Sequence, residues 1–175
     1  MLVFMPILLD SVSYSIVFSI FFNYENGLIN NTVRLLGGEG PQWLNVGWLA
    51  KTVLMIAITW RWTGYNTVIM LSGLQSISND LYESASIDGA GRIKQFFYIT
   101  VPGLKPVLIF AVVLSVNGML QLFTEPFLLT AGGPVNETLT IVQYLYQKGF
   151  RSFDFGAASA GSYVLVILIA VLTYI

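Results

Sequence analysis

Four apolar segments alternate with polar, glycine-rich stretches along the chain. A helix needs about 20 mostly apolar residues to cross the hydrocarbon core of a bilayer, and each segment reaches roughly that length. Because backbone polar groups in lipid must be satisfied within the segment, each segment is expected to be a helix. The pattern therefore predicts an all-α, polytopic membrane bundle. The predicted spans are about 1–22, 48–74, 104–123 and 156–175, separated by 23–47, 75–103 and 124–155.

The composition favours lipid over water as the surroundings of this chain. Hydrophobic residues make up 55% and charged residues 10%, whereas soluble domains carry about a quarter charged residues. The net charge of -1 argues against nucleic acid as a partner, because phosphate binding needs clustered basic residues. The sequence has no cysteine and no histidine, so disulfides, thiolate chemistry, His-ligated metals and Ser-His or Cys-His catalytic units are excluded. No metal site is expected.

Both ends of the sequence lie inside apolar segments. The N-terminal segment lacks the basic region and the small-residue cleavage site of a signal peptide. The chain is therefore expected to be a piece of a longer polypeptide, or a product that has lost its ends. Basic residues are slightly more frequent in the middle stretch than in the two flanking it, which favours a cytoplasmic middle stretch and cytoplasmic ends.

The middle stretch, 78–102, predicts a helix–glycine–helix elbow. Asp80 is suited to cap a helix, with Glu83 reaching back toward it. Gly89 is suited to end that helix, because glycine tolerates a left-handed backbone. The prolines that follow are expected at the start of the next span. On composition alone, an ordinary amphipathic interfacial loop explains the stretch equally well.

The spacing of residues in this stretch resembles the EAA loop of binding-protein-dependent ABC importer permeases. Gly89, Ile99 and Pro102 fall at the family's offsets from Glu83, and a serine replaces the first alanine. The resemblance implies a coupling helix that docks on a cytoplasmic ATPase subunit, where Glu83 makes a polar contact, Ala85 allows close approach and Gly89 makes the turn. The residues assigned to this coupling are Glu83, Ser84, Ala85, Asp88, Gly89, Ala90, Ile99 and Pro102.

A second block resembles the last external loop of the carbohydrate-importing branch of the same family. Its Gly-Gly-Pro run at 132–134 is interpreted as a tight turn that identifies the branch. The residues that carry this resemblance are Leu129, Thr130, Gly132, Gly133, Pro134, Thr138, Tyr144, Tyr146, Phe150, Phe155 and Gly156.

Together these resemblances cover residues 1–175 and imply a type I ABC importer permease of the MetI-like fold. Such a permease moves a sugar or sugar-like solute across the bacterial or archaeal cytoplasmic membrane by alternating access. The implied partners are ABC ATPase subunits, a second homologous permease, an extracytoplasmic solute-binding protein and membrane lipid. ATP and Mg would be held by the partner ATPase, so this chain is expected to bind no cofactor and to be no enzyme.

Asp10 and Arg61 are the two ionisable residues well within the predicted spans. Such residues usually face a bundle interior or water and have a partner. At 1.5 Å per residue both lie about 18–20 Å below the outer ends of their spans. Equal depth and opposite sign suggest an ion pair with a gating role. The alternative, equally open, is that Arg61 contacts a partner subunit or a cavity.

Polar and aromatic residues of two predicted spans suggest a solute path. Sugars are bound by amides and charged groups together with aromatic faces, and spans 48–74 and 104–123 contain both kinds. Hydrogen bonding between helices explains the amides equally well. The candidate residues are Asn66, Asn117, Gln121, Trp62 and Tyr65.

Two rival functions belong to other classes. An intramembrane aspartate enzyme would use Asp10, but a single intramembrane aspartate makes no dyad. A passive channel or a structural membrane subunit is the stronger alternative, although neither has a use for a docking elbow.

Overall fold

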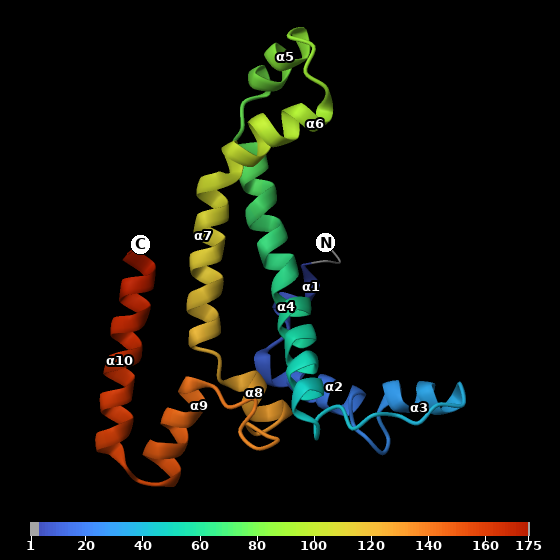
Figure 1. Cartoon of the computed structure of the whole chain (residues 1–175), viewed down its shortest axis with the longest axis vertical. Coiled ribbons are helices and arrows are strands. Elements are labelled where there is room, and N and C mark those ends of the chain that lie inside the picture. The colour runs from blue at the N-terminus through green and yellow to red at the C-terminus, as the bar shows by residue number, and fades with distance from the viewer. Residues whose placement is uncertain (1–3, 175) are drawn as a thin grey trace.

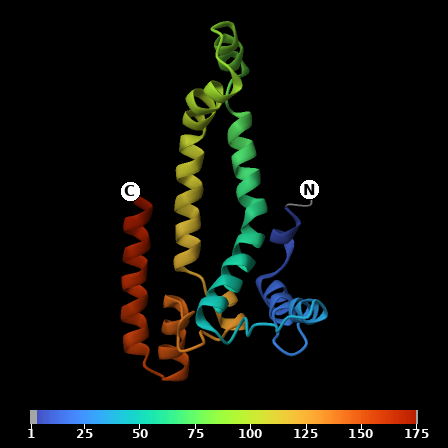
Figure 2. The same cartoon turned by 45° about the vertical axis from the view of Figure 1, so that its right-hand side comes forward.

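The computed structural model describes residues 4–174, and over that range every regular element is a helix. Two long helices, α4 and α7, lie side by side and form a hairpin, with the short helices α5 and α6 at one end and a group of short helices at the other (Figures 1 and 2). The all-α prediction is confirmed. The elements are α1 (Met5–Leu8), α2 (Ser11–Phe21), α3 (Leu28–Leu35), α4 (Gly47–Gln75), α5 (Asn79–Ile87), α6 (Arg92–Gln95), η1 (Phe96–Thr100), α7 (Val101–Leu120), α8 (Thr124–Leu129), α9 (Ile141–Tyr146), η2 (Gln147–Arg151) and α10 (Phe155–Tyr174).

The first predicted span is not one helix. Residues 1–3 lie outside the described range, and from there α1 and α2 are separated by Leu9 and Asp10, both with extended backbones. The Asp10 carboxylate accepts a hydrogen bond from the Val12 amide at 3.0 Å, so it caps α2. The prediction of a continuous helix over 1–22 is therefore wrong, because Asp10 begins a helix and does not sit inside one. Figure 1 shows α2 running across the end of α4 rather than alongside it.

The α4–α7 hairpin is closed by glycines near its elbow end. A Cβ atom on Gly73 would lie 2.9 Å from side-chain carbons of Leu104 and Val107 of α7, and one on Gly103 would lie 2.8 Å from Ile77. Each glycine thus lets the opposite segment approach more closely than any larger residue would allow. This contact places the elbow directly over the hairpin.

The second arm of the hairpin starts much earlier than the sequence predicted. Arg92–Leu120 forms a 29-residue helical stretch, in which η1 is a wide π-helical turn. Pro102 is the second residue of α7 and Pro106 lies inside it, but neither begins the helical stretch, which starts at Arg92. A proline ring lacks the N–H and crowds the carbonyl four residues earlier, and the wider turn of a π-helix accommodates such a break. This helical stretch bends between α6 and α7 (Figure 1).

At the other end of the hairpin, α2 and α8 pack against α4. Tyr14, Leu54, Ala57 and Leu129 form the buried cluster that joins these three helices. The chain then turns back through α9 and η2 into α10, where a Cβ on Gly161 would lie 2.5 Å from Leu145. This end holds the small compact core of the described residues.

Two helical stretches within residues 4–174 are long and apolar enough to cross a membrane, Arg92–Leu120 and Phe155–Tyr174. Helix α4 has 29 residues, so it is long enough to span, but it contains Lys51, Arg61 and several threonines and glycines. One long helix thus occurs at three of the four predicted spans, and two shorter helices occur at the first. Four spans remain a prediction.

Candidate functional site

A cleft of about 790 Å³ opens between α4 and α7, a volume within the usual range for small-molecule sites. Residues 121–125 and Ser11 of α2 close it at the end remote from the elbow. The cleft lies in the hairpin whose far end carries the elbow.

One wall of the cleft combines aromatic and hydroxyl groups from α4. Trp62 and Tyr65 contact each other edge to face, with ring centroids 5.6 Å apart. The Thr67 hydroxyl donates to the Thr63 carbonyl at 2.7 Å, which leaves its oxygen lone pairs free as acceptors. Asn66 lies beside them and donates its amide to the Trp62 carbonyl at 3.2 Å. A solute in the cleft would thus meet aromatic rings and hydrogen-bond acceptors together.

The structure brings four of the five predicted solute-path residues together. Trp62, Tyr65, Asn66 and Gln121 all line the cleft. Asn117 does not, because its side chain donates to the Thr173 hydroxyl of α10 at 3.0 Å. Its amide joins two helices, which is the alternative that the sequence left open.

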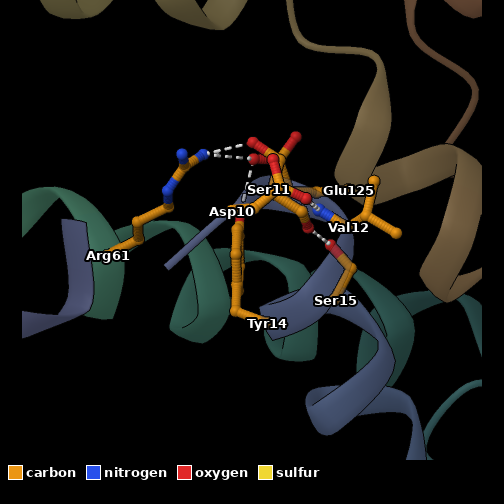
Figure 3. Close-up of polar contacts among 7 residues, drawn as sticks. All are labelled: Asp10, Ser11, Val12, Tyr14, Ser15, Arg61 and Glu125. Carbon is orange, nitrogen blue, oxygen red and sulfur yellow. Dashed lines mark hydrogen bonds and ion pairs between the residues drawn. The ribbon is translucent and has the colours of Figure 1, made fainter. Parts of the chain in front are cut away.

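A charged cluster lies at the closed end of the cleft (Figure 3). Arg61 Nη1 donates to Ser11 Oγ at 2.6 Å and lies 3.4 Å from Glu125 Oε1. The Tyr14 hydroxyl donates to the same carboxylate oxygen. The Glu125 and Arg61 side chains are only 6% and 15% exposed. Because breaking a buried pair leaves an uncompensated charge, the members of this cluster hold one another in place.

The guanidinium group of Arg61 is also held by aromatic faces. Its central carbon lies 5.0 Å from the Tyr14 ring centroid and 5.7 Å from that of Trp62, within cation–π distance. Its Nε is buried without a hydrogen-bond partner among the described residues. Arg61 is thereby fixed between the ion pair and the cleft wall.

The predicted pair of Asp10 with Arg61 is replaced by a pair of Glu125 with Arg61. Asp10 is exposed and caps α2, which directs its carboxylate to a backbone amide. Glu125 was missed because it follows the third predicted span and was counted as part of an external loop. The signal was present: Glu125 is the only acid in an apolar run from Phe123 to Leu129, and α8 buries it beside Arg61.

The elbow (residues 78–102) is a second candidate site, and its turn has the predicted geometry. Gly89 has a φ of +78°. The Ala90 amide donates to the Ala85 carbonyl at 2.8 Å and the Gly89 amide donates to the Ser86 carbonyl at 3.1 Å. This is the Schellman pattern that ends helices at glycine. The predicted cap was wrong, because Ser78 Oγ, not Asp80, accepts from a first-turn amide at 3.2 Å.

Polar contacts brace the two arms of the elbow. Gln95 Nε2 donates to Ser86 Oγ at 2.9 Å and to the Ala90 carbonyl at 3.0 Å. The Tyr82 hydroxyl lies 2.9 Å from Thr100 Oγ1. These bonds connect α5 to α6 and η1, so the elbow is a shaped unit and not a loose loop.

The elbow exposes the residues that the sequence assigned to coupling. Glu83, Ser84, Asp88, Gly89 and Pro102 are exposed, and Ala85, Ala90 and Ile99 are half-buried. Apolar side chains are exposed beside them: Ile87 is 87% and Ile93 is 76% exposed. An exposed apolar patch with small residues is typical of a protein contact surface.

The block at 129–156 forms a turn followed by α9 and η2. The Gly133 amide donates to the Thr130 carbonyl at 2.8 Å, so the tight turn has formed. Thr138 ties the loop together: its hydroxyl lies 2.6 Å from that of Thr130 and donates to the Gly133 carbonyl at 2.7 Å. Tyr146 and Phe150 stack against each other with centroids 5.3 Å apart. These residues shape the fold at this end of the hairpin.

An all-helical hairpin with a cleft and an exposed elbow is the arrangement expected from the resemblance to importer permeases. A family model described as "Binding-protein-dependent transport system inner membrane component" matches residues 1–175. The chain belongs to this family, as the residues of the elbow predict.

Curated relatives are transport permeases. The chain is 42% identical, over 99% of its length and 60% of the relative, to the lactose transport system permease protein LacF of Rhizobium radiobacter. It is 37% identical, over 97% of its length and 54% of the relative, to the arabinooligosaccharides transport system permease protein AraP of Halalkalibacterium halodurans. The chain thus spans a little over half the length of these relatives.

A solved structure has the same fold. A bacterial ABC transporter involved in the import of the acidic polysaccharide alginate matches with a TM-score of 0.88 and 24% identity, over 98% of this chain and 60% of that one. The match supports the helical arrangement of an ABC importer permease.

Proposed function

We propose that this chain is part of the permease subunit of an ATP-driven importer for a sugar or sugar-like solute. The observation that carries the proposal is the placement of two features on one hairpin. A polar and aromatic cleft lies between α4 and α7, and the exposed elbow connects the same two helices. A contact at the elbow can therefore change the geometry of the cleft walls, as alternating access requires.

The elbow would dock on a separate ATPase subunit that binds ATP and Mg. Its exposed surface offers the Glu83 carboxylate, the small residues Ser84 and Ala85, and apolar side chains such as Ile87. A second homologous permease would complete the solute path, since the cleft is open and formed by one hairpin. An extracytoplasmic solute-binding protein would deliver the solute, and a structure related in fold was solved in complex with such a periplasmic protein.

The sugar class of the solute is supported by the cleft and by the relatives. Aromatic faces with hydroxyl and amide groups are the usual partners of sugars, and Trp62, Tyr65, Asn66 and Gln121 provide them. Relatives with 37–42% identity are named as permeases for lactose and arabinooligosaccharides. This chain would move its solute by rearrangement of helices, and no residue of it would perform chemistry.

Crosslinking at the elbow tests the proposal. An Ala85→Cys substitution is introduced into the cysteine-free chain in its native membrane, a bifunctional thiol reagent is added, and the captured protein is identified. Capture of a soluble subunit with a Walker motif, weakened by Glu83→Ala, is the expected result. Val135→Cys, at a 92% exposed position near the opposite end of the hairpin, is the matched control. Capture of only membrane chains by Ala85→Cys would favour the passive channel or structural subunit instead.

A further inference from the structure

The charge inventory of the cleft limits the kind of solute that it accepts. Among the residues that line the cleft, Arg61 is the only basic side chain and Glu125 is the only carboxylate. They are paired with each other at 3.4 Å, and Glu125 also accepts from Tyr14. The charged groups therefore cancel at the closed end, and the remaining lining of the cleft is apolar, hydroxyl and amide.

From this we infer that the wall contributed by this chain selects an uncharged polyhydroxylated solute over an anionic one; the inference rests on the proposed solute path. An anionic solute needs a cation that is free to pair with it. The charge of Arg61 is not available, because Nη1 is paired with Glu125 and bonded to Ser11, and the guanidinium is held against two aromatic rings. A second anion beside Glu125 would meet like-charge repulsion, which is costly where water is partly excluded.

Arg61 still has a part in recognising a neutral solute. Figure 3 draws contacts to only one of its two terminal nitrogens. The other terminal nitrogen can donate to a hydroxyl of a solute without giving up the Glu125 pair. A guanidinium neutralised by a carboxylate thus acts as an oriented hydrogen-bond donor rather than as a net charge.

Two measurements test the inference: the electrostatic potential in the cleft, and the binding of a neutral sugar compared with a carboxylated one. Gly118 lines the cleft, and a Cβ there meets nothing within 4 Å. A Gly118→Cys variant of the complete importer, in membrane vesicles, is treated with neutral, anionic and cationic methanethiosulfonates, and the rates are normalised to those of a free small thiol. Lactose and its carboxylated analogue lactobionate are then compared as protecting solutes.

Two single variants should shift the electrostatic potential in the cleft in opposite directions. In the parent, normalised rates for the three reagents should agree within a few-fold, and lactose should protect at about tenfold lower concentration than lactobionate. Glu125→Gln leaves the charge of Arg61 uncompensated and should speed the anionic reagent about tenfold, while Arg61→Gln should slow it by a similar factor, as expected for one unit charge in the same cleft. The double variant should return to the parent order, which separates charge from any loss of packing. Glu137→Gln removes an exposed acid outside the cleft and should leave the three reagent rates unchanged.

The outcomes separate the inference from the proposed function. Lactobionate protecting as well as lactose in the parent, or an anionic reagent reacting much faster than the neutral one, would overturn the uncharged-solute inference and leave the solute path intact. If neither sugar protects while the reagent rates change as expected in the variants, the solute path in this cleft is overturned, and the inference with it.

Discussion

Gly89 offers a clean test of the elbow, because its role is purely conformational. Its φ of +78° is a left-handed backbone, and an added Cβ meets nothing within 4 Å. Gly89→Ala thus introduces no clash and costs only the left-handed conformation of a residue with a side chain, about 1–2 kcal/mol. That free energy corresponds to a roughly 5- to 30-fold increase in the fraction of molecules with an open turn, at about 1.4 kcal/mol per factor of ten.

Hydrogen exchange measures this opening directly. The Ala90 amide donates to the Ala85 carbonyl at 2.8 Å across the turn, so its exchange rate should rise by the same 5- to 30-fold in Gly89→Ala. Solute-stimulated ATPase activity of the reconstituted importer should fall in parallel, and Gly89→Asn should be milder because asparagine tolerates this conformation.

Gly91 provides the matched control, since a Cβ there also meets nothing within 4 Å and its φ is -68°. Gly91→Ala should leave both exchange and ATPase activity near the parent values. Equal effects of Gly89→Ala and Gly91→Ala on exchange would refute the reasoning, because one substitution is strained and the other is not.

Three further predictions concern packing and charge at other positions. Tyr14→Phe leaves the buried Glu125 carboxylate one donor short, and we expect a loss of about 1–3 kcal/mol, seen as a lower melting temperature in detergent, with Tyr24→Phe unchanged. Gly73→Leu forces α4 away from α7 and should cost at least about 1–3 kcal/mol, with impaired transport; retention of full uptake and stability would contradict the close approach. Lys51→Ala removes an ion pair with Glu137 whose side chains are 50% and 45% exposed, so stability should fall by less than about 1 kcal/mol, and a larger loss on thermal unfolding would show that this pair is not merely a surface contact.

The turn of the elbow could be predicted from sequence because a single residue determines it. Gly89 ends α5 through its own backbone freedom, which depends on no distant contact. The cap was harder to predict, since Ser78 and Asp80 are both good capping residues and lie two positions apart. Which of them caps α5 depends on the residue at which α4 ends, and tertiary packing determines that residue.

The ion partner of Arg61 could not be predicted from equal depth in the membrane. Asp10 would lie at the depth of Arg61 only in a straight helix over 1–22, whereas it interrupts that segment and caps α2. The break rotates α2 across α4 and brings Tyr14 toward Glu125, a residue more than one hundred positions later. Such a contact between distant segments leaves no periodic signal in a single sequence, although the lone acid among apolar neighbours marks Glu125 as a residue that needs a partner.

The hydrogen bonds within the elbow also indicate which helix would move if a partner rotated the elbow. Tyr82 and Gln95 tie α5 to η1 and α6, so α5 turns together with the start of the second arm. The wide turn η1 and the two prolines after it are the compliant joint of that arm, because they lack regular helical hydrogen bonds. Rotation of the elbow would therefore swing α7 about this joint, while the close packing at Gly73 and Gly103 keeps the start of α7 against the end of α4 and Ile77. In such a movement α7 would follow the elbow, and α4 would stay in place as its neighbour.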